Sequence, residues 1–374
     1  MCVRHMSHSL FWFHGLLVLA GSPALAEVMN VTADGRTAGG SVTVTVSGQS
    51  AGGSMAVQHL FAFSESVKGA AIAAGSPYGC GADKQGHLPH GACYYGGINV
   101  QKTIRYVRQR FQQGLIDDPS NLWSTPVVVF NGRNDWEVYP SVSRAILKQL
   151  RRFIKNSQVE GVLSTDAAHV WSLDHGRCKC GACAWWGSGG LCCDVNNCQY
   201  DLSGHMLGRF YGPLYARTQA RQVLSWIPQE QYLPPQDGYW KSSHMMKWAI
   251  LYAPTGCLQA PAECRIHVHY HGCIANRWLQ RVMWVNNLDL NEYAEANNII
   301  VLYPQAKGDA ATGKGCWNWG FPEDDQFFDT KRSVQLTVVM GLISDLAQAI
   351  PQAAELPNTV GPPTVDHDSE SVVV

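Results

Sequence analysis

The sequence lacks both an excess of charge and a long apolar segment. It has 28 Lys and Arg against 29 Asp and Glu, so its formal net charge is −1, and charged residues make up only 15% of it. Such a chain offers no electrostatic basis for binding nucleic acid or an anionic membrane surface. The apolar run Leu10–Ala20 is too short to span a bilayer.

What the chain does contain is typical of a large folded globule. It has 374 residues, of which 46% are hydrophobic, and 13 are Trp. A single α/β domain of this size is ordinary. We expect one domain over residues 27–350. Residues 351–374 are Pro-rich and acidic, which predicts a disordered tail.

The first 26 residues have the pattern of a signal peptide. Arg4 precedes the apolar run, and Ala24-Leu25-Ala26 is a cleavage signal of the A-x-A type. We therefore expect a mature chain that begins at Glu27, is secreted and has no further membrane segment. Asn30-Val31-Thr32 is then a glycosylation sequon in a eukaryotic host.

Cysteines are numerous, and secretion decides how they are interpreted. Of the 13, Cys2 lies in the predicted signal peptide, and the remaining twelve form an even set in an oxidising compartment. Cys80 and Cys93 flank a loop that they could staple. In the Cys-rich insertion 178–198, Cys180-Gly-Ala-Cys183 has zinc-ligand spacing, but no second well-spaced pair accompanies it. Disulfides are therefore favoured over zinc.

The chain is organised around Gly48-Gln49-Ser50-Ala51-Gly52. This is the G-x-S-x-G pattern, and it lies between a β-branched segment (Ser41–Ser47) and a helix-compatible one (Ser54–Phe63). The pattern needs this context, because a sharp turn from strand to helix exposes the central serine. A Gly/Ser-rich loop could match by chance, but the flanking elements favour Ser50 as a nucleophile.

Two further strand ends supply an acid and a base. The predicted strand at 125–132 leads to Asp135, and a short one at Gly161–Ser164 leads to His169. Strands that alternate with helices predict a parallel α/β sheet, where chemistry gathers at the carboxyl ends of strands. The order Ser, Asp, His is that of α/β hydrolases. Rival acids and bases in this region are Asp117, Asp118, Asp166, His175, His59, His87 and His90.

A late strand, Ile266–Tyr270, ends in His271-Gly272-Cys273. A strand that leads into His-Gly is where an α/β hydrolase places its second oxyanion donor, and this segment normally precedes the nucleophile. Here it follows by more than two hundred residues. His267, His269 and His271 would share one strand face and could suggest a metal site, but no carboxylate accompanies them, so we expect no metal or other cofactor.

The late oxyanion segment is explained by a circular permutation with the nucleophile strand first. In this respect the chain resembles secreted poly(3-hydroxybutyrate) depolymerases of the single-domain fungal type. The motifs that carry the resemblance run in that family's order over nearly the whole mature chain. They are Gly48–Gly53, Asn131–Asp135, His169–Trp171, Cys198–Asp201, Phe210–Arg217, His271–Cys273, Asn297–Gln305 and Gly315–Trp319.

The resemblance implies a circularly permuted α/β-hydrolase fold and roles for individual residues. Ser50 would be the nucleophile, Asp135 the orienting acid and His169 the general base. The backbone amides of Ala51 and Cys273 would form the oxyanion hole.

The resemblance also implies disulfides and an aromatic lining. Cys273 would pair with Cys316, and Cys257 with Cys264. Trp317 and Trp319 would line an apolar cleft for a polyester, although ordinary core packing is an alternative for both.

Two departures from the family pattern bear on the substrate. The insertion 178–198 has additional cysteines and two tryptophans, Trp185 and Trp186, and Asn131 replaces a more usual histidine. The resemblance implies hydrolysis of a poly(3-hydroxybutyrate)-type polyester to short oligomers. A feruloyl or acetyl esterase acting on plant polysaccharide, and an inactive binding protein on the same fold, remain alternatives.

Overall fold

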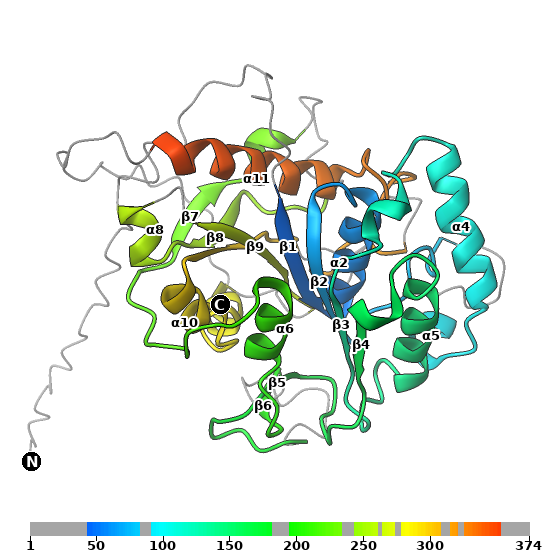
Figure 1. Ribbon diagram of the computed structural model, residues 1–374, viewed down its shortest axis with the longest axis horizontal. Helices are drawn as coiled ribbons and strands as arrows, with labels where there is room; N and C mark the ends of the chain where they lie inside the picture. The colour runs from blue at the N-terminus through cyan, green and yellow to red at the C-terminus, as the bar shows by residue number, and fades with distance from the viewer. Residues whose placement is uncertain are drawn as a thin grey trace, which may run out of the picture.

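The computed structural model describes residues 43–82, 91–181, 194–233, 243–260, 264–273, 278–307, 315–320 and 325–352. Its centre is an eight-stranded sheet with the order β4-β3-β2-β1-β9-β10-β8-β7 (Figure 1). The strands are β1 Val44–Gln49, β2 Val67–Ala73, β3 Val127–Phe130, β4 Val159–Val162, β7 Ser225–Pro228, β8 Trp248–Tyr252, β9 Arg265–Tyr270 and β10 Ile299–Tyr303. Only the pairings that involve β8 are antiparallel, so the expected mostly parallel sheet is confirmed.

The strand order is that of a circularly permuted α/β hydrolase, as the sequence predicted. β1, the strand before Ser50, lies in the middle of the sheet between β2 and β9. Ser47 of β1 faces His269 of β9, although 222 residues separate them in the chain. All six residues of β1 are buried, which is expected of a central strand covered on both faces.

Helices cover both faces of the sheet (Figure 1). One hydrophobic cluster packs α2, α4, α5 and α11 against one face, and a second cluster packs α6, α9 and α10 against the other. Their bounds are α2 Ala51–Ala62, α4 Val100–Gln112, α5 Pro140–Leu150, α6 Leu202–Tyr211, α9 Trp278–Val285, α10 Leu290–Asn297 and α11 Val334–Gln352. Shorter helices are α3 Gly91–Tyr95, α8 Thr255–Gln259 and the 3₁₀ turns η1 Pro119–Leu122, η2 Asn156–Gln158 and η4 Glu230–Tyr232.

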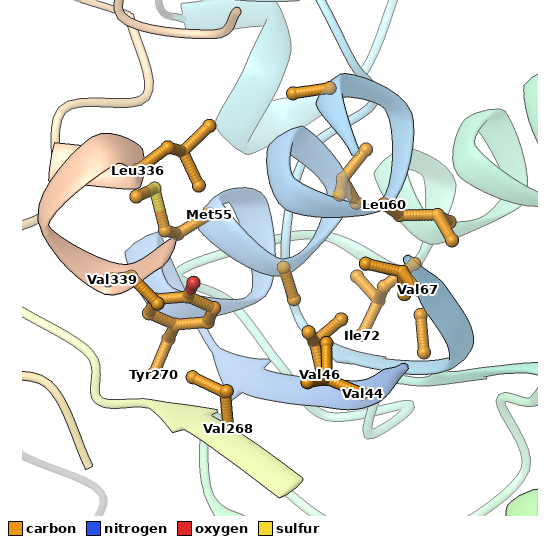
Figure 2. Close-up of a cluster of buried hydrophobic side chains, with 14 of the residues drawn as sticks. Val44, Val46, Met55, Leu60, Val67, Ile72, Val268, Tyr270, Leu336 and Val339 are labelled. Atoms are coloured by element: carbon orange, nitrogen blue, oxygen red, sulfur yellow. The ribbon is translucent and has the colours of Figure 1, made fainter. Parts of the chain in front are cut away.

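The helix after the nucleophile is buried along its whole length. Every residue of α2 is buried, because the helix packs against the sheet and against α11 in one hydrophobic cluster. Figure 2 shows Met55 of α2 beside Leu336 and Val339 of α11, with Tyr270 of β9 next to them. The position of Ser50 is therefore set by the packing of the buried elements α2, α11 and β9, and not by a surface loop.

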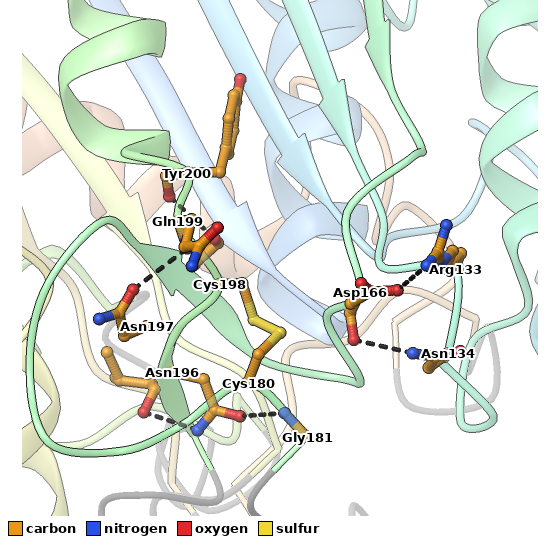
Figure 3. Close-up of a disulfide and its surroundings, with 12 residues drawn as sticks. Arg133, Asn134, Asp166, Cys180, Gly181, Asn196, Asn197, Cys198, Gln199 and Tyr200 are labelled. Carbon is orange, nitrogen blue, oxygen red and sulfur yellow. Dashed lines mark hydrogen bonds and ion pairs between the residues drawn. A yellow bond between two sulfur atoms is a disulfide. The ribbon is translucent and has the colours of Figure 1, made fainter.

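A small second sheet follows the catalytic region and was not predicted from the sequence. β5 (Trp171–Leu173) pairs in parallel with β6 (Val195–Asn197). Three residues per strand are too few to give a recognisable hydrophobic period. The disulfide between Cys180 and Cys198 links the segment that leaves β5 to the end of β6 (Figure 3).

Three further disulfides agree with the expected pairs. They are Cys80–Cys93, Cys257–Cys264 and Cys273–Cys316. Pairing of Cys180 with Cys198 removes both from any zinc site, and Cys178 is disulfide-bonded as well.

Several expectations lie outside the described residues. These concern the signal peptide 1–26, the sequon at Asn30, residues 353–374 of the predicted tail, Cys183, Cys192, Cys193, Trp185, Trp186, His87 and His90. Among the described residues, no helix is long and apolar enough to cross a membrane.

Candidate active site

Ser50 occupies a strained turn between β1 and α2. Its φ of 58° lies in a region that residues with a side chain rarely adopt, and its ψ is −123°. The Ser50 amide donates to the Ala73 carbonyl at 2.9 Å, and the Ser54 amide donates to the Ser50 carbonyl at 3.0 Å. These bonds hold the strained backbone at the carboxyl end of β1. This is the geometry of a nucleophile elbow.

The glycines on either side of Ser50 permit close backbone packing. A Cβ placed on Gly48 would lie 2.2 Å from the Gly52 carbonyl oxygen, and one on Gly52 would lie 2.1 Å from the Tyr270 carbonyl oxygen. No side chain fits at either position. The first turn of α2 therefore touches the end of β9, where the predicted oxyanion segment begins.

Asp135 is a buried carboxylate that accepts four hydrogen bonds. Its Oδ1 accepts from the backbone amides of Glu137 at 3.0 Å and Val138 at 2.9 Å. Its Oδ2 accepts from the Asn131 side-chain amide at 2.9 Å and from Nδ1 of His169 at 2.8 Å. A carboxylate held by four donors cannot rotate, so it fixes both the orientation and the tautomer of the imidazole.

The loops after β3 and β4 are joined along their backbones, which brings the acid and the base together. The Arg133 amide donates to the Thr165 carbonyl at 2.9 Å, and the Asn134 amide donates to the Ala167 carbonyl at 3.1 Å. A Cβ on Gly132 would lie only 1.9 Å from that same Ala167 oxygen. This close approach requires glycine and places Asp135 directly beneath His169.

His169 is tied to the nucleophile strand as well as to Asp135. The side-chain amide of Gln49, the residue before Ser50, donates to the His169 carbonyl at 3.2 Å. The His169 side chain is 11% exposed, whereas that of Asp135 is fully buried. The outer nitrogen, Nε2, lies 4.0 Å from Oε2 of Glu137. Asp135 and His169 thus form a hydrogen-bonded pair, and Gln49 ties that pair to the residue before Ser50.

Carboxylates around His169 control its charge. Burial lowers the pKa of His169, but the charge of Asp135, its hydrogen bond, and the charges of Glu137 and Asp194 together raise that pKa above its ordinary value. Burial, followed by the charge of Glu137, raises the pKa of Asp194 to about 6, while His169 opposes that rise. Two carboxylates outside the predicted triad therefore act on the imidazole.

The rival acids and bases among the described residues have other partners. Asp117 binds Lys331 at 2.8 Å, Asp118 caps η1 by accepting from the Ser120 amide, and Asp166 pairs with Arg133 (Figure 3). His59 is buried against α11 and bonds to the Tyr270 hydroxyl at 2.7 Å. His175 contacts Asp289 at 2.7 Å. None of these contacts involves Asp135 or His169.

The predicted oxyanion segment is fastened from two sides. His271 donates from Nδ1 to the Gly272 carbonyl at 2.7 Å, and its Nε2 accepts from the Ala306 amide at 3.1 Å. Burial, followed by the charge of Arg281, lowers the pKa of His271 to about 3, so the ring is neutral. The Cys273–Cys316 disulfide holds the following residue. Cys273 as an oxyanion donor stays a prediction.

Ala51 supplies the other predicted donor. It is the first residue of α2, and an amide in the first turn of a helix has no acceptor within that helix. Because the helix dipole also favours negative charge there, this amide suits a developing oxyanion. Its role in the oxyanion hole likewise stays a prediction.

The two tryptophans predicted to line a cleft are both buried. Trp317 has no exposed surface, packs against Tyr270, and donates from Nε1 to the His271 carbonyl at 3.0 Å. Trp319 is 5% exposed and meets Tyr94 edge to face. In this conformation Trp317 packs against the end of β9 and supports the predicted oxyanion segment. Contact of either ring with a substrate is therefore not supported by the geometry.

The histidines of β9 are structural groups of the sheet. His267 bonds to Thr45 and Ser47 at 2.8 and 2.7 Å, and His269 bonds to Ser47 at 2.8 Å and to Trp284 at 3.3 Å. Burial lowers the pKa of His267 to about 3, so its ring is neutral. Both ring nitrogens of each histidine are already bonded, which leaves none for a metal ion.

One other cluster has ligand-like spacing. Atoms of Asp174, His175 and Asp289 lie within 4.8 Å of one another. Arg217 already contacts Asp174 at 2.8 Å and Asp289 at 3.4 Å. The guanidinium supplies the positive charge in this network, so the cluster is an ion-pair network rather than an open metal site.

Known proteins that are similar to this chain in sequence are depolymerases of poly(3-hydroxybutyrate). A poly(3-hydroxybutyrate) depolymerase of Delftia acidovorans is 29% identical over 335 residues, which cover 86% of this chain and 64% of the relative. A polyhydroxybutyrate depolymerase of Talaromyces funiculosus is 28% identical over 308 residues, covering 78% of this chain and 86% of the relative. No protein-family model matches the chain.

Solved structures give the same result. A PHB depolymerase variant with serine replaced by alanine, complexed with an R3HB trimer, superposes with a TM-score of 0.72 at 26% identity. The PHB depolymerase of Penicillium funiculosum superposes with a TM-score of 0.70 at 26% identity. Each comparison covers 83% of this chain and 98% of the solved one. The chain resembles the poly(3-hydroxybutyrate) depolymerases in both sequence and fold. The predicted resemblance to the fungal type is confirmed.

Within this depolymerase-like site, four residues were not identified as functional from the sequence. Asn131 was noted only as a departure, yet it bonds Asp135, the Val138 carbonyl and the Ser143 hydroxyl. Gln49, Glu137 and Asp194 are the other three. Gln49 and Glu137 lie within two residues of Ser50 and Asp135 in the chain, which was a signal, whereas Asp194 has no such neighbour. Only the folded loops show how these residues reach the site.

Proposed function

We propose that this chain is a secreted serine esterase that hydrolyses a poly(3-hydroxybutyrate)-type polyester to short 3-hydroxyacid oligomers. The observation that carries the chemistry is the strained Ser50 elbow together with the Asp135–His169 pair. The substrate class rests on similarity to depolymerases, one of which was solved with an R3HB trimer. The chain spans about 64% of the length of the Delftia relative. The substrate of that relative is therefore a proposal for this chain.

The geometry supports a two-step mechanism. Ser50 Oγ attacks the ester carbonyl and its proton moves to Nε2 of His169, while Asp135 stabilises the resulting imidazolium. The tetrahedral intermediate collapses as the bond to the leaving oxygen breaks, and His169 returns the proton to that alcohol. Water, deprotonated by His169, then attacks the acyl-serine and releases the new carboxylic acid and free Ser50.

The backbone donors supply the remaining stabilisation. We assign the amides of Ala51 and Cys273 to the oxyanion, because α2 and the end of β9 approach each other at Gly52. Two donors in a rigid site lower the barrier, since they need no reorganisation as charge develops. The reaction needs no metal or other cofactor in this scheme.

Secretion is supported by two features of the sequence and structure. The first 26 residues have a signal-peptide pattern, and disulfides join four described cysteine pairs. The insoluble polyester would then be met outside the cell. The feruloyl or acetyl esterase and the inactive binding protein are not favoured, because the similar proteins are depolymerases of poly(3-hydroxybutyrate).

Replacing the nucleophile tests this proposal. The secreted protein should clear a poly(3-hydroxybutyrate) film and hydrolyse short p-nitrophenyl esters. Ser50→Ala should lower kcat by on the order of 10⁴-fold or more, because the acyl-enzyme cannot form. A fluorophosphonate probe should label the wild type and leave the variant unlabelled. Comparison of 3-hydroxybutyrate release with ferulate or acetate release from polysaccharide decides between the ester classes.

A further inference from the structure

Two carboxylates outside the triad act on His169, and one of them, Glu137, lies beside its outer nitrogen. Oε2 of Glu137 is 4.0 Å from Nε2, and the Glu137 side chain is 33% exposed, so it contacts both the imidazole and solvent. The backbone amide of Glu137 donates to Asp135, which fixes the position of this residue. Asp194 is the second carboxylate, and its charge interacts with both Glu137 and His169.

The small sheet places Asp194 at the active site. The Trp171 amide, two residues after His169, donates to the Asp194 carbonyl at 2.8 Å. The next residue, Val195, begins β6 and pairs with Trp171. The Cys180–Cys198 disulfide and a bond from the Gly181 amide to Asn196 hold this strand (Figure 3). The Cys-rich insertion therefore delivers a negative side chain to the site.

The position of Nε2 indicates which part of a substrate would lie near these two carboxylates. It is the atom that returns a proton to the leaving alcohol, so the leaving portion of the ester passes beside it. In a 3-hydroxyacid polyester the leaving portion is the part that ends in the free carboxyl group. If the ester cleaved is the last in the chain, that carboxylate lies only a few atoms from the leaving oxygen.

We propose that Glu137 and Asp194 form a charge filter on the leaving-group side of the site, which disfavours cleavage of the last ester before a free carboxylate end. The inference rests on the proposed polyester hydrolysis and specifies where that hydrolysis occurs along a chain. Internal esters have a neutral leaving portion next to Nε2 and escape the repulsion. The filter therefore directs cleavage to internal bonds and favours oligomers over monomers as products.

A defined trimer of 3-hydroxybutyrate tests the filter. Its last unit is deuterated, so cleavage of the last ester releases a deuterated monomer, and the trimer is prepared as the free acid and as the methyl amide. Assays at about pH 8 keep Asp194 ionised, because its pKa is about 6. The quantity compared is kcat/KM for last-ester cleavage of the acid divided by that of the amide.

The wild type should cleave the last ester of the amide faster than that of the acid. Glu137→Gln should raise the acid-to-amide ratio by about three- to tenfold, because one repulsive charge near the leaving carboxylate is removed. Asp194→Asn should shift the ratio in the same direction. Added salt should raise the ratio of the wild type, since screening weakens the repulsion. Glu65→Gln is the matched control, because Glu65 lies at the amino end of β2, whereas Ser50 follows the carboxyl end of the parallel neighbouring strand β1.

Each other outcome has a definite meaning. If Glu137→Gln changes both trimers by the same factor, Glu137 acts only through His169 and the filter is wrong. If the wild type leaves the last ester of the amide intact while cleaving the first, charge is not what protects that bond, and the filter is again wrong. If the wild type cleaves neither trimer nor the polymer, the proposed function itself fails.

Discussion

At the scale of single residues, the site depends on hydrogen bonds that keep Asp135 and His169 in one arrangement. Asn131 contributes one of four donors to the Asp135 carboxylate and is itself oriented by Ser143. It stands where a histidine is more usual in the family the sequence resembles. An amide nitrogen supplies the same hydrogen bond as an imidazole N–H, which explains how the substitution preserves the site.

Residue-scale electrostatics predict a pH shift for a Glu137 variant. In the proposed mechanism the free imidazole of His169 is the base, so activity should fall as pH drops through its pKa. Asp135, Glu137 and Asp194 all raise that pKa against the opposing effect of burial. Glu137→Gln removes one of these charges and should therefore lower the pKa of His169. The acid limb of the kcat/KM profile on a neutral p-nitrophenyl ester should move to lower pH.

The control for this shift is again Glu65→Gln, whose profile should match that of the wild type. An acid limb that stays in place, or moves to higher pH, would show that the Glu137 charge does not reach Nε2.

At the scale of elements, the site lies where α2 meets β9. The first turn of α2 approaches the carbonyls of Tyr270 and His271 so closely that only glycine fits at position 52. This contact sets the distance between the Ala51 amide and the segment that leads to Cys273. The proposed oxyanion hole therefore depends on two elements in contact, and neither element would form it alone.

Two glycine-to-alanine substitutions distinguish the effect of this close contact from the general gain in helix propensity. Gly52→Ala should destabilise the fold by about 3 kcal/mol or lower kcat severely, because its Cβ would lie 2.1 Å from the Tyr270 oxygen and 2.4 Å from the His271 oxygen. Gly208→Ala in α6 is the control, since a Cβ there meets nothing within 4 Å. It should stabilise the protein by about 0.5–1 kcal/mol and leave activity unchanged. Urea unfolding and ester hydrolysis measure both effects.

At the scale of the whole molecule, the disulfides differ widely in the length of the chain segment that each one closes. Cys273–Cys316 closes 43 residues of sequence and joins the oxyanion segment to the loop of Trp317. Cys257–Cys264 closes only 7 and staples one short helix, α8, to the start of β9. The entropy removed from the unfolded chain grows with the length of the loop closed.

Loop length predicts the ranking of these two bridges. Replacing both cysteines of the Cys273–Cys316 pair by Ala should cost about 4 kcal/mol of unfolding free energy, against about 2.5 kcal/mol for the Cys257–Cys264 pair. Urea denaturation of the two double variants measures the difference. Equal losses would contradict the chain-entropy explanation.

Much of the fold could be predicted from the sequence because its signals are local. β9 was predicted to within one residue at one end, and β3 lies inside the predicted strand 125–132, because apolar runs bounded by turn residues mark buried strands. The nucleophile strand was placed too early: β1 runs to Gln49 and α2 begins at Ala51, so the elbow is tighter than propensity indicates. β5, β6, α9 and α10 were missed, because short elements give little periodicity.

By itself, the sequence determined the chemistry: a serine between two glycines after a buried strand, then an acid and a histidine in α/β-hydrolase order. Those signals are local, since each depends on a few neighbouring residues. Only the tertiary structure decided which side chains surround His169 and which way Trp317 faces. Asn131, Glu137 and Asp194 reach the site through loops packed against one another. Contacts between distant segments follow from the packing of the whole sheet, and no local pattern encodes them.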